Sequence, residues 1–201
     1  MLKTGLVSIT FRKLSPEEIV DLVRRAGLSG IEWGGDVHAP HGDVETARQI
    51  RRLTEDAGLE VASYGSYYRV GETTGFSFQD VLQSAAALGA PAVRVWAGKR
   101  GSAQADADYR QHVASETRRI AELAADVNMR VTYEFHGNTL TDTTESTLAL
   151  LKQVDHPNVF TYWQPPVGWT EADLQESLRS VIPWLVNLHV FMWGDDGTRH
   201  P

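Results

Sequence analysis

The chain has 201 residues, and its content of 42% hydrophobic and 22% charged residues is typical of a globular protein. The net charge of −7 disfavours a nucleic-acid partner held through its phosphates, and without an apolar run of about 18 residues we expect no membrane span or membrane partner. The absence of cysteine removes disulfides and thiolate metal sites. Together with an N-terminus that lacks the features of a signal peptide, it favours a cytoplasmic location.

Strand-like and helix-like segments alternate from the N-terminus onward. An apolar run at 5–10 predicts the first strand, and Ser15, Pro16 and Glu18 predict a capped helix that ends at Gly27. The cycle is then predicted three more times. These segments are strand 31–33 with a helix from Val44 to Gly58, strand 59–64 with a helix from Ser77 to Gly89, and strand 92–96 with a long helix carrying Val113, Ile120, Leu123 and Val127 on one face and ending at Asn128.

The second half of the chain continues the alternation. A strand is predicted at 130–133, leading into Glu134, and Asp142 with Glu145 frames the start of the next helix. A strand at 159–163 and a helix that opens at Thr170 and Asp173 follow, and the last predicted strand covers 186–191.

This regular alternation predicts an α/β fold with a parallel sheet and right-handed crossovers, built as one domain over 1–201. A doubly wound sheet usually carries a Gly-rich phosphate loop after its first strand, whereas here that position reads Thr10-Phe11-Arg12-Lys13. Functional-looking residues also follow most of the strands. We therefore predict a TIM-type (β/α) barrel.

The predicted strand count is one short of a closed barrel of this type, which has eight strands in about 250 residues. We therefore expect a barrel truncated at the C-terminus, without the eighth βα unit. The first and last strands would then have open edges, and such edges pair readily with another molecule. This predicts a homo-oligomer formed through the exposed barrel edges.

Three polar clusters lie at or near the ends of predicted strands in the second half: Tyr133-Glu134-Phe135-His136, Tyr162-Trp163-Gln164 and Leu188-His189-Val190. In a parallel barrel the ends of the strands converge, so a carboxylate, an amide and an imidazole are predicted to meet at one place.

The stretches Gly30–Trp33, Ala92–Gly98, Tyr133–Gly137 and Asn187–Val190, in this order, resemble the xylose isomerase-like TIM barrels, the superfamily of sugar phosphate isomerases/epimerases and AP endonuclease 2. The resemblance implies a divalent metal at the barrel mouth, held by a Glu after strand five, an Asp or similar group after strand six, a His after strand seven and a Glu after strand eight. Glu134 and His189 match the first and third ligands. Gln164 stands where the Asp is usual, and the fourth ligand has no counterpart among the predicted strands.

The resemblance therefore implies a Mn, Co, Mg or Zn site formed by Glu134, Gln164 and His189, with weak metal binding or none. It also implies that Glu134 is the general base, and the alternative is a structural salt bridge to Arg94 or Lys99. Gln164 has the alternative of a rigid turn residue, and His189 that of a satisfied core histidine. His136 shares a strand face with Glu134, which favours a catalytic proton relay or a substrate contact.

Further candidates are predicted to bind the substrate. They are a carboxylate and an arginine, Glu32 and Arg94, and four aromatic residues at strand ends, Trp33, Tyr64, Trp96 and Trp163. An ion pair is the alternative for Glu32. Aromatic walls suit the C–H faces of sugar rings, but the same side chains suit a barrel core equally well.

The leading functional hypothesis is a metal-dependent isomerase or epimerase that moves a proton next to the carbonyl of a small sugar or polyol. A dehydratase of the same superfamily needs similar geometry and is not distinguished from it. A second hypothesis is an inactive barrel fragment that binds a ligand or partner without turnover. A DNA-repair endonuclease is less favoured because the chain is acidic.

Overall fold

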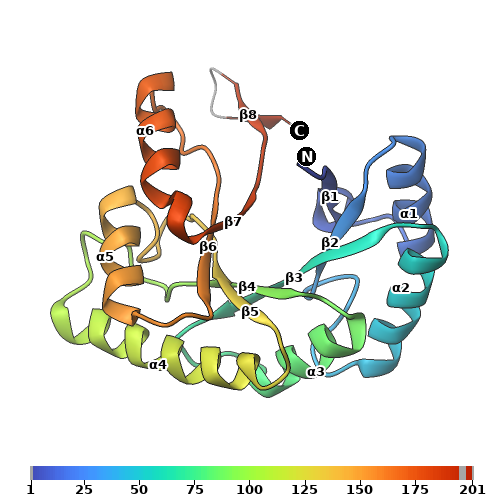
Figure 1. Cartoon of the computed structure of the whole chain (residues 1–201), viewed down its shortest axis with the longest axis horizontal. Helices are drawn as coiled ribbons and strands as arrows, with labels where there is room; N and C mark the ends of the chain where they lie inside the picture. The colour runs from blue at the N-terminus through green and yellow to red at the C-terminus, as the bar shows by residue number, and fades with distance from the viewer. Residues whose placement is uncertain (1, 195–197, 201) are drawn as a thin grey trace. The chain divides into compact units, whose positions relative to one another are not determined.

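Figure 1 shows the chain as a computed structural model, which describes residues 2–194 and 198–200. Seven strands form one sheet in the order β1-β2-β3-β4-β5-β6-β7, and β8 pairs with β9 in a separate antiparallel hairpin. The strands are β1 Gly5–Val7, β2 Gly30–Gly34, β3 Glu60–Arg69, β4 Ala92–Trp96, β5 Arg130–Tyr133, β6 Val159–Trp163, β7 Leu185–Leu188, β8 Met192–Trp193 and β9 Arg199–His200.

Six α-helices of the described chain lie between the sheet strands, one after each strand from β1 to β6, as the alternation predicted. They are α1 Pro16–Arg25, α2 Val44–Asp56, α3 Phe78–Leu88, α4 Ala107–Ala125, α5 Thr144–Val154 and α6 Glu171–Val181. Two short 3₁₀ helices, η1 Ser8–Phe11 and η2 Ile182–Trp184, complete the set. None of the helices in the described residues combines the length and the apolarity that crossing a membrane requires.

The helix ends confirm most of the local sequence signals. Ser15 caps α1 and Ser77 caps α3, each in a capping box with the acidic residue three positions later, and Thr170 does the same for α6. Gly27 and Asn128 adopt the positive φ angles that end helices, +68° and +56°.

Helix α5 begins at Thr144, between Asp142 and Glu145, as the sequence predicted. Thr143, rather than Asp142, caps this helix, because its side chain accepts a hydrogen bond from the Ser146 amide at 3.2 Å. The Asp142 carboxylate instead accepts one from the Ser102 amide at 2.9 Å, so it stabilises a loop rather than the helix.

The bounds predicted for β4, β5 and β6 are those of the structure. The first strand is shorter than predicted, because Ser8 begins a 3₁₀ helix in which its buried hydroxyl accepts a hydrogen bond from the Gly34 amide at 2.9 Å. The third strand is longer and ends at Arg69. The seventh ends at Leu188, so His189 follows the strand instead of lying inside it.

The residue contacts divide the chain into two compact units that do not follow sequence order. The first unit contains the chain up to Tyr68 and the segments 73–95 and 122–131. Its strands β1, β2 and β3 pair in parallel, with Gly5 opposite Gly30 and Gly30 opposite Glu60. Helix α2 packs against both α1 and α3. Folding of 1–201 as a single domain stays a prediction.

The second unit contains the segments 69–72 and 96–121 and the chain from residue 132 onward. Its strands β6 and β7 pair in parallel, and α5 packs against α6. Phe135, Trp163 and Val181 form a buried cluster that partly buried leucines of α5, α6 and β7 extend. This packing fixes the strand ends from which the polar side chains of the unit project.

Candidate active site

Several chemically active side chains of the second unit lie at or just beyond strand ends. Trp96 ends β4, Glu134 follows β5, Gln164 follows β6 and His189 follows β7. The backbone ladder continues past the last strand, because the His189 amide donates to the Trp163 carbonyl at 3.0 Å. This extra ladder bond fixes His189 beside Gln164.

The Glu134 carboxylate is almost completely buried, with 8% of the residue exposed. The Trp96 indole N–H donates a hydrogen bond to its Oε2 at 2.5 Å. A buried carboxylate needs such partners, because moving a charged group out of water without a compensating hydrogen bond costs free energy. Oε1 faces the Nδ1 of His189 at 3.6 Å. One carboxylate oxygen is thus held by the indole, and the other is directed toward the imidazole.

Gln164 completes this group of side chains. Its amide nitrogen donates to the Phe135 carbonyl, and this bond directs its Oε1 toward His189, whose Nδ1 lies 3.3 Å away. The His189 ring is itself oriented by Tyr162, against which it packs edge-on with ring centres 5.1 Å apart. The structure therefore brings Glu134, Gln164 and His189 together, as the three strand-end clusters predicted.

The two separations measured from His189 Nδ1 are compatible with a divalent cation shared by this group. Ligands about 2.0–2.1 Å from a tetrahedral cation lie about 3.4 Å from one another, which is close to the 3.3 and 3.6 Å found here. His189 Nδ1, Glu134 Oε1 and Gln164 Oε1 can therefore share either a proton carried by Nδ1 or a cation. Over the described residues there is no group of three or more His, Asp or Glu side chains placed to hold a metal, so a cation would need the Gln164 amide.

His136 and Arg69 lie against the same indole. The His136 ring centre is 4.5 Å from that of Trp96, and its Nδ1 lies 2.7 Å from the Gly137 carbonyl. The Arg69 guanidinium stacks over the Trp96 ring, with Cζ 4.2 Å from its centre. The pairing of Trp96 with Glu134 therefore places a histidine and an arginine close to the buried carboxylate.

Sequence reasoning named Tyr162 only as part of its cluster and gave it no role of its own. For Arg69 it took surface solvation as the default, with binding of a phosphate or carboxylate as the alternative. A signal for Tyr162 was present, because residues two apart share a strand face and Tyr162 is two residues before Gln164. No comparable signal predicted that Arg69 lies against the Trp96 ring, since its position depends on β3 extending to residue 69 and on a partner 27 positions away in sequence.

Two further candidates, Glu32 and Arg94, form a buried ion pair in the first unit. Arg94 Nε lies 2.8 Å from Glu32 Oε1, and the two side chains are 2% and 3% exposed. Ser63 donates to the other carboxylate oxygen at 2.6 Å, and the Arg94 guanidinium stacks over the Tyr67 ring at 4.9 Å. The ion-pair alternative for Glu32 is therefore present in the structure.

The remaining aromatic candidates lie in the interior. Trp33 and Tyr64 are fully buried in the first unit, where Trp33 donates to Thr54 of α2 at 3.2 Å and the Tyr64 hydroxyl donates to the Ala39 carbonyl at 2.7 Å. Trp163 is in the core of the second unit and donates to Ser177 of α6 at 2.9 Å. These side chains point toward helices or loops of their own units.

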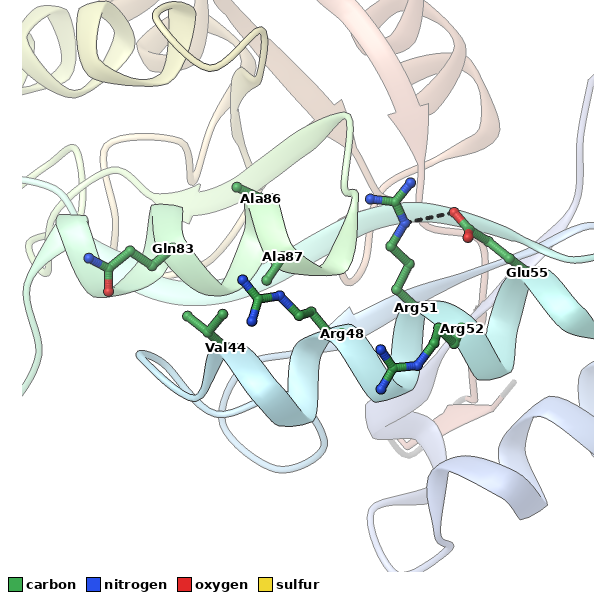
Figure 2. Close-up of a pocket in the computed structure, with 8 residues that line it drawn as sticks. All are labelled: Val44, Arg48, Arg51, Arg52, Glu55, Gln83, Ala86 and Ala87. Atoms are coloured by element: carbon green, nitrogen blue, oxygen red, sulfur yellow. Dashed lines mark hydrogen bonds and ion pairs between the residues drawn. The ribbon is translucent and has the colours of Figure 1, made fainter.

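A groove of about 600 Å³ lies between α2 and α3 in the first unit (Figure 2). Three arginines line it, but their charges are compensated by carboxylates. Arg51 pairs with Glu55 at 2.8 Å, and Arg48 and Arg52 lie 3.8 and 3.5 Å from Glu45. None of the candidate site residues lines this groove.

Comparison with known proteins gives one family model, described as xylose isomerase-like TIM barrel, that matches residues 20–191. A 3-dehydroshikimate dehydratase of Bacillus anthracis is 33% identical over 202 aligned positions, which cover 94% of this chain and 71% of that protein.

Solved structures agree with this match. A probable 3-DHS dehydratase involved in petrobactin synthesis from Bacillus anthracis has a TM-score of 0.81 at 30% identity, covering 97% of this chain and 75% of that chain. A D-allulose 3-epimerase from Methylomonas has a TM-score of 0.74 at 17% identity, covering 98% of this chain and 77% of that chain, which supports the fold alone. The described sheet is thus seven strands of a TIM-type (β/α) barrel fold.

Proposed function

The chain belongs to the xylose isomerase-like TIM barrel family, and from this membership we propose that it is a dehydratase acting on 3-dehydroshikimate or a closely similar cyclic hydroxyketone. The observation that carries the proposal is the convergence of Glu134, Gln164 and His189 at neighbouring strand ends. The choice of dehydration over other reactions of the family rests on the 33% identity to a protein named for that reaction.

Loss of water from such a ring is a proton transfer next to a carbonyl followed by an elimination. A base takes the proton from the carbon beside the ketone, the C–O bond of the β-hydroxyl breaks, and the proton goes to the departing oxygen, so that water leaves. The ring then loses one more carbon-bound proton while the ketone oxygen gains one. For 3-dehydroshikimate the product is an aromatic dihydroxybenzoate.

The setting of Glu134 supports its assignment as the base in this reaction. The carboxylate is buried, so it is shielded from water and available to accept a proton from the substrate. The Trp96 N–H holds Oε2, so that Oε1 faces the site. We assign the relay of the proton to the departing hydroxyl to His136, and its contact with the same indole supports this assignment. Tyr162 packs edge-on against the His189 ring and limits its rotation, which keeps Nδ1 directed toward Glu134 and Gln164.

We further propose that Glu134, Gln164 and His189 hold a divalent cation such as Mn, Co, Mg or Zn. When bound, a cation supplies polarisation of the substrate ketone, which lowers the pKa of the adjacent C–H bond. Only one of the three side chains is an anion, so we expect weak binding by this chain.

A sugar isomerase or epimerase is the second candidate. It uses the same proton abstraction beside a carbonyl, but epimerisation also needs a proton-transfer group on the opposite face of the substrate. His136 favours this candidate, because it is a second titratable group against the Trp96 ring that holds Glu134. A small sugar or polyol would then be the substrate.

The test is turnover by the purified chain, with each of the four metals in turn. We expect the ultraviolet absorbance of a dihydroxybenzoate to appear from 3-dehydroshikimate, and Glu134→Gln to lower kcat by about 10²- to 10⁴-fold. Glu145→Gln, on the exposed first turn of α5, is the matched control and should retain activity.

Other results would exclude the proposal. Deuterium incorporation from D₂O into ketoses, without dihydroxybenzoate formation, would assign the epimerase reaction instead. If neither reaction occurs with any of these metals, the alternative hypothesis of ligand binding without turnover is favoured instead.

We also propose that the chain acts in the cytoplasm and forms homo-oligomers through the edges of its sheet. The strands β1 and β7 each have one neighbour in the described sheet. Open edges of this kind favour pairing with a second copy.

A further inference from the structure

Arg69 has an unusual setting for a cation in the second unit. It is the last residue of β3 and is only partly exposed. Its guanidinium lies flat over Trp96, with Cζ 4.2 Å from the ring centre, and Nη1 donates to the Gly98 carbonyl at 3.1 Å. Within residues 2–194 and 198–200, the recorded ion pairs of the unit leave Arg69 without a carboxylate partner.

The side chain is therefore fixed in place, while no carboxylate among the described residues forms an ion pair with it. Stacking and the Gly98 carbonyl use one face and one N–H of the guanidinium. A guanidinium has five N–H donors in a rigid fork, so several remain for a ligand. A fork held in this way is suited to bidentate recognition of a carboxylate, because little side-chain entropy is lost on binding.

The same indole links Arg69 to the proposed base. Trp96 presents its ring face to the guanidinium and its N–H to Glu134 Oε2 at 2.5 Å. Arg69 and Glu134 thus both contact the same indole, one at its ring face and the other at its N–H. A six-membered ring with a carboxylate at one end and a reactive carbon at the other has dimensions comparable to those of the indole.

We propose that Arg69 binds the carboxylate of the substrate and so sets the substrate class as a cyclic monocarboxylic acid rather than a neutral sugar. This inference rests on the proposed function of the Glu134 site, since it assigns the other end of the same substrate. Arg69 contacts the substrate but takes no part in proton transfer, so it is a specificity-determining residue.

A purely structural role makes a different prediction. If Arg69 only orients Trp96 through the cation–π contact, its loss disturbs Glu134 and weakens every ligand of the site equally. Arg100 provides a matched control in the same unit. Its guanidinium also stacks over an aromatic ring, Tyr109, at 4.4 Å, but Asp106 lies 3.8 Å from it.

The experiment is calorimetric titration of the whole chain with two probes, 3,4-dihydroxybenzoate and catechol. The probes share a ring and a diol and differ only in the carboxylate, so any contribution from a bound metal is common to both. We expect Arg69→Gln to weaken 3,4-dihydroxybenzoate about 10- to 100-fold while catechol binding is unchanged. Arg69→Lys should lose part of this affinity, and Arg100→Gln should lose none.

The inference is overturned if Arg69→Gln weakens both probes equally or neither, or if the unaltered chain does not prefer the carboxylate. Far-ultraviolet circular dichroism confirms that each variant is folded. Failure of the proposed function gives a distinct result, namely selective carboxylate binding through Arg69 without dehydration of 3-dehydroshikimate. Conversely, dehydration with an unchanged KM in Arg69→Gln would remove the Arg69 assignment and leave the function.

Discussion

Arg94 and Lys3 both make ion pairs in the first unit, but in opposite environments. Arg94 and its partner Glu32 are 2% and 3% exposed, whereas Lys3 and Glu60 are 68% and 60% exposed, although their atoms are only 2.5 Å apart. Removing one member of a buried pair leaves a charge without its counter-ion in a medium of low dielectric constant, whereas water replaces a partner at the surface.

We therefore expect Arg94→Met to lower the free energy of unfolding by about 3–5 kcal/mol, and Lys3→Met by no more than about 1 kcal/mol. Urea denaturation followed by circular dichroism measures both changes. If Arg94→Met instead retains full stability but loses ligand affinity, the substrate-binding hypothesis for Arg94 is favoured over a structural role.

Trp96 holds Glu134 through a single N–H bond. Trp96→Phe keeps an aromatic ring under Arg69 but removes this donor. Since a hydrogen bond to a charged group contributes about 1.5–3 kcal/mol, we expect kcat to fall about 10- to 100-fold while the fold is retained. Trp184→Phe, in η2, is the control and should retain kcat. An equal fall of kcat in both variants would show that the loss is not caused by the missing hydrogen bond between Trp96 and Glu134.

At the scale of elements, the loop between β2 and α2 is attached to the first unit by two histidines. His38 Nδ1 lies 3.0 Å from Ser8 Oγ and Nε2 lies 3.2 Å from the Leu14 carbonyl. His41 Nδ1 lies 2.8 Å from the Tyr64 hydroxyl, and its ring stacks on Phe76. Burial lowers the pKa of both imidazoles below the ordinary value of 6.5, because it penalises the charged form.

A lowered histidine pKa means that the unfolded chain binds more protons than the folded chain at mildly acid pH. The contribution to stability is thus fully present above pH 6.5 and is lost as the pH falls toward the lowered pKa values. We expect the free energy of unfolding to decrease from pH 7 to about pH 5, and His41→Gln to have a shallower decrease. Equal pH slopes for the two proteins would contradict this account of His41.

Helix α3 depends on a reciprocal cap at its first turn. The Ser77 hydroxyl accepts from the Asp80 amide, and the Asp80 carboxylate accepts from the Ser77 amide at 2.8 Å. Ser77→Ala should therefore reduce the free energy of unfolding by about 1 kcal/mol, within a range of 0.5–2. Ser115→Ala, at an exposed position inside α4, should be neutral or slightly stabilising, because alanine is the better helix former. Urea denaturation distinguishes the two.

At the scale of the whole molecule, the edge strand β7 is flanked by exposed apolar side chains. Ile182 is 59% exposed and Val190 is 81% exposed, and every residue of β7 is partly exposed. We expect concentration-dependent self-association in sedimentation velocity, weakened by Ile182→Lys combined with Val190→Glu. Val127→Glu, which changes an exposed apolar residue elsewhere, should leave it unaltered, and a monomer at all concentrations would refute association through this edge.

Local signals predicted much of the fold because their physical causes act within a few residues. The capping boxes of Ser15, Ser77 and Thr170 connect residues only three positions apart, so the sequence contains both partners. The 3₁₀ helix at Ser8–Phe11 was missed because Ser8 is held by the Gly34 amide, 26 positions away. When a hydrogen bond to a distant residue decides between strand and turn, the neighbouring residues carry no sequence pattern that predicts the outcome.

The sequence by itself determined the alternation of strands and helices and the placement of Glu134 and Gln164 directly after strands, whereas it placed His189 inside the last strand. Periodicity and capping act along the chain, so these features can be read in order. Only the tertiary structure decided that Glu32 pairs with Arg94, that Trp163 packs in the core, and that Arg69 stacks on the indole that holds Glu134. Those contacts depend on which strands are neighbours, on their register and on where each strand stops, and they join residues far apart in sequence.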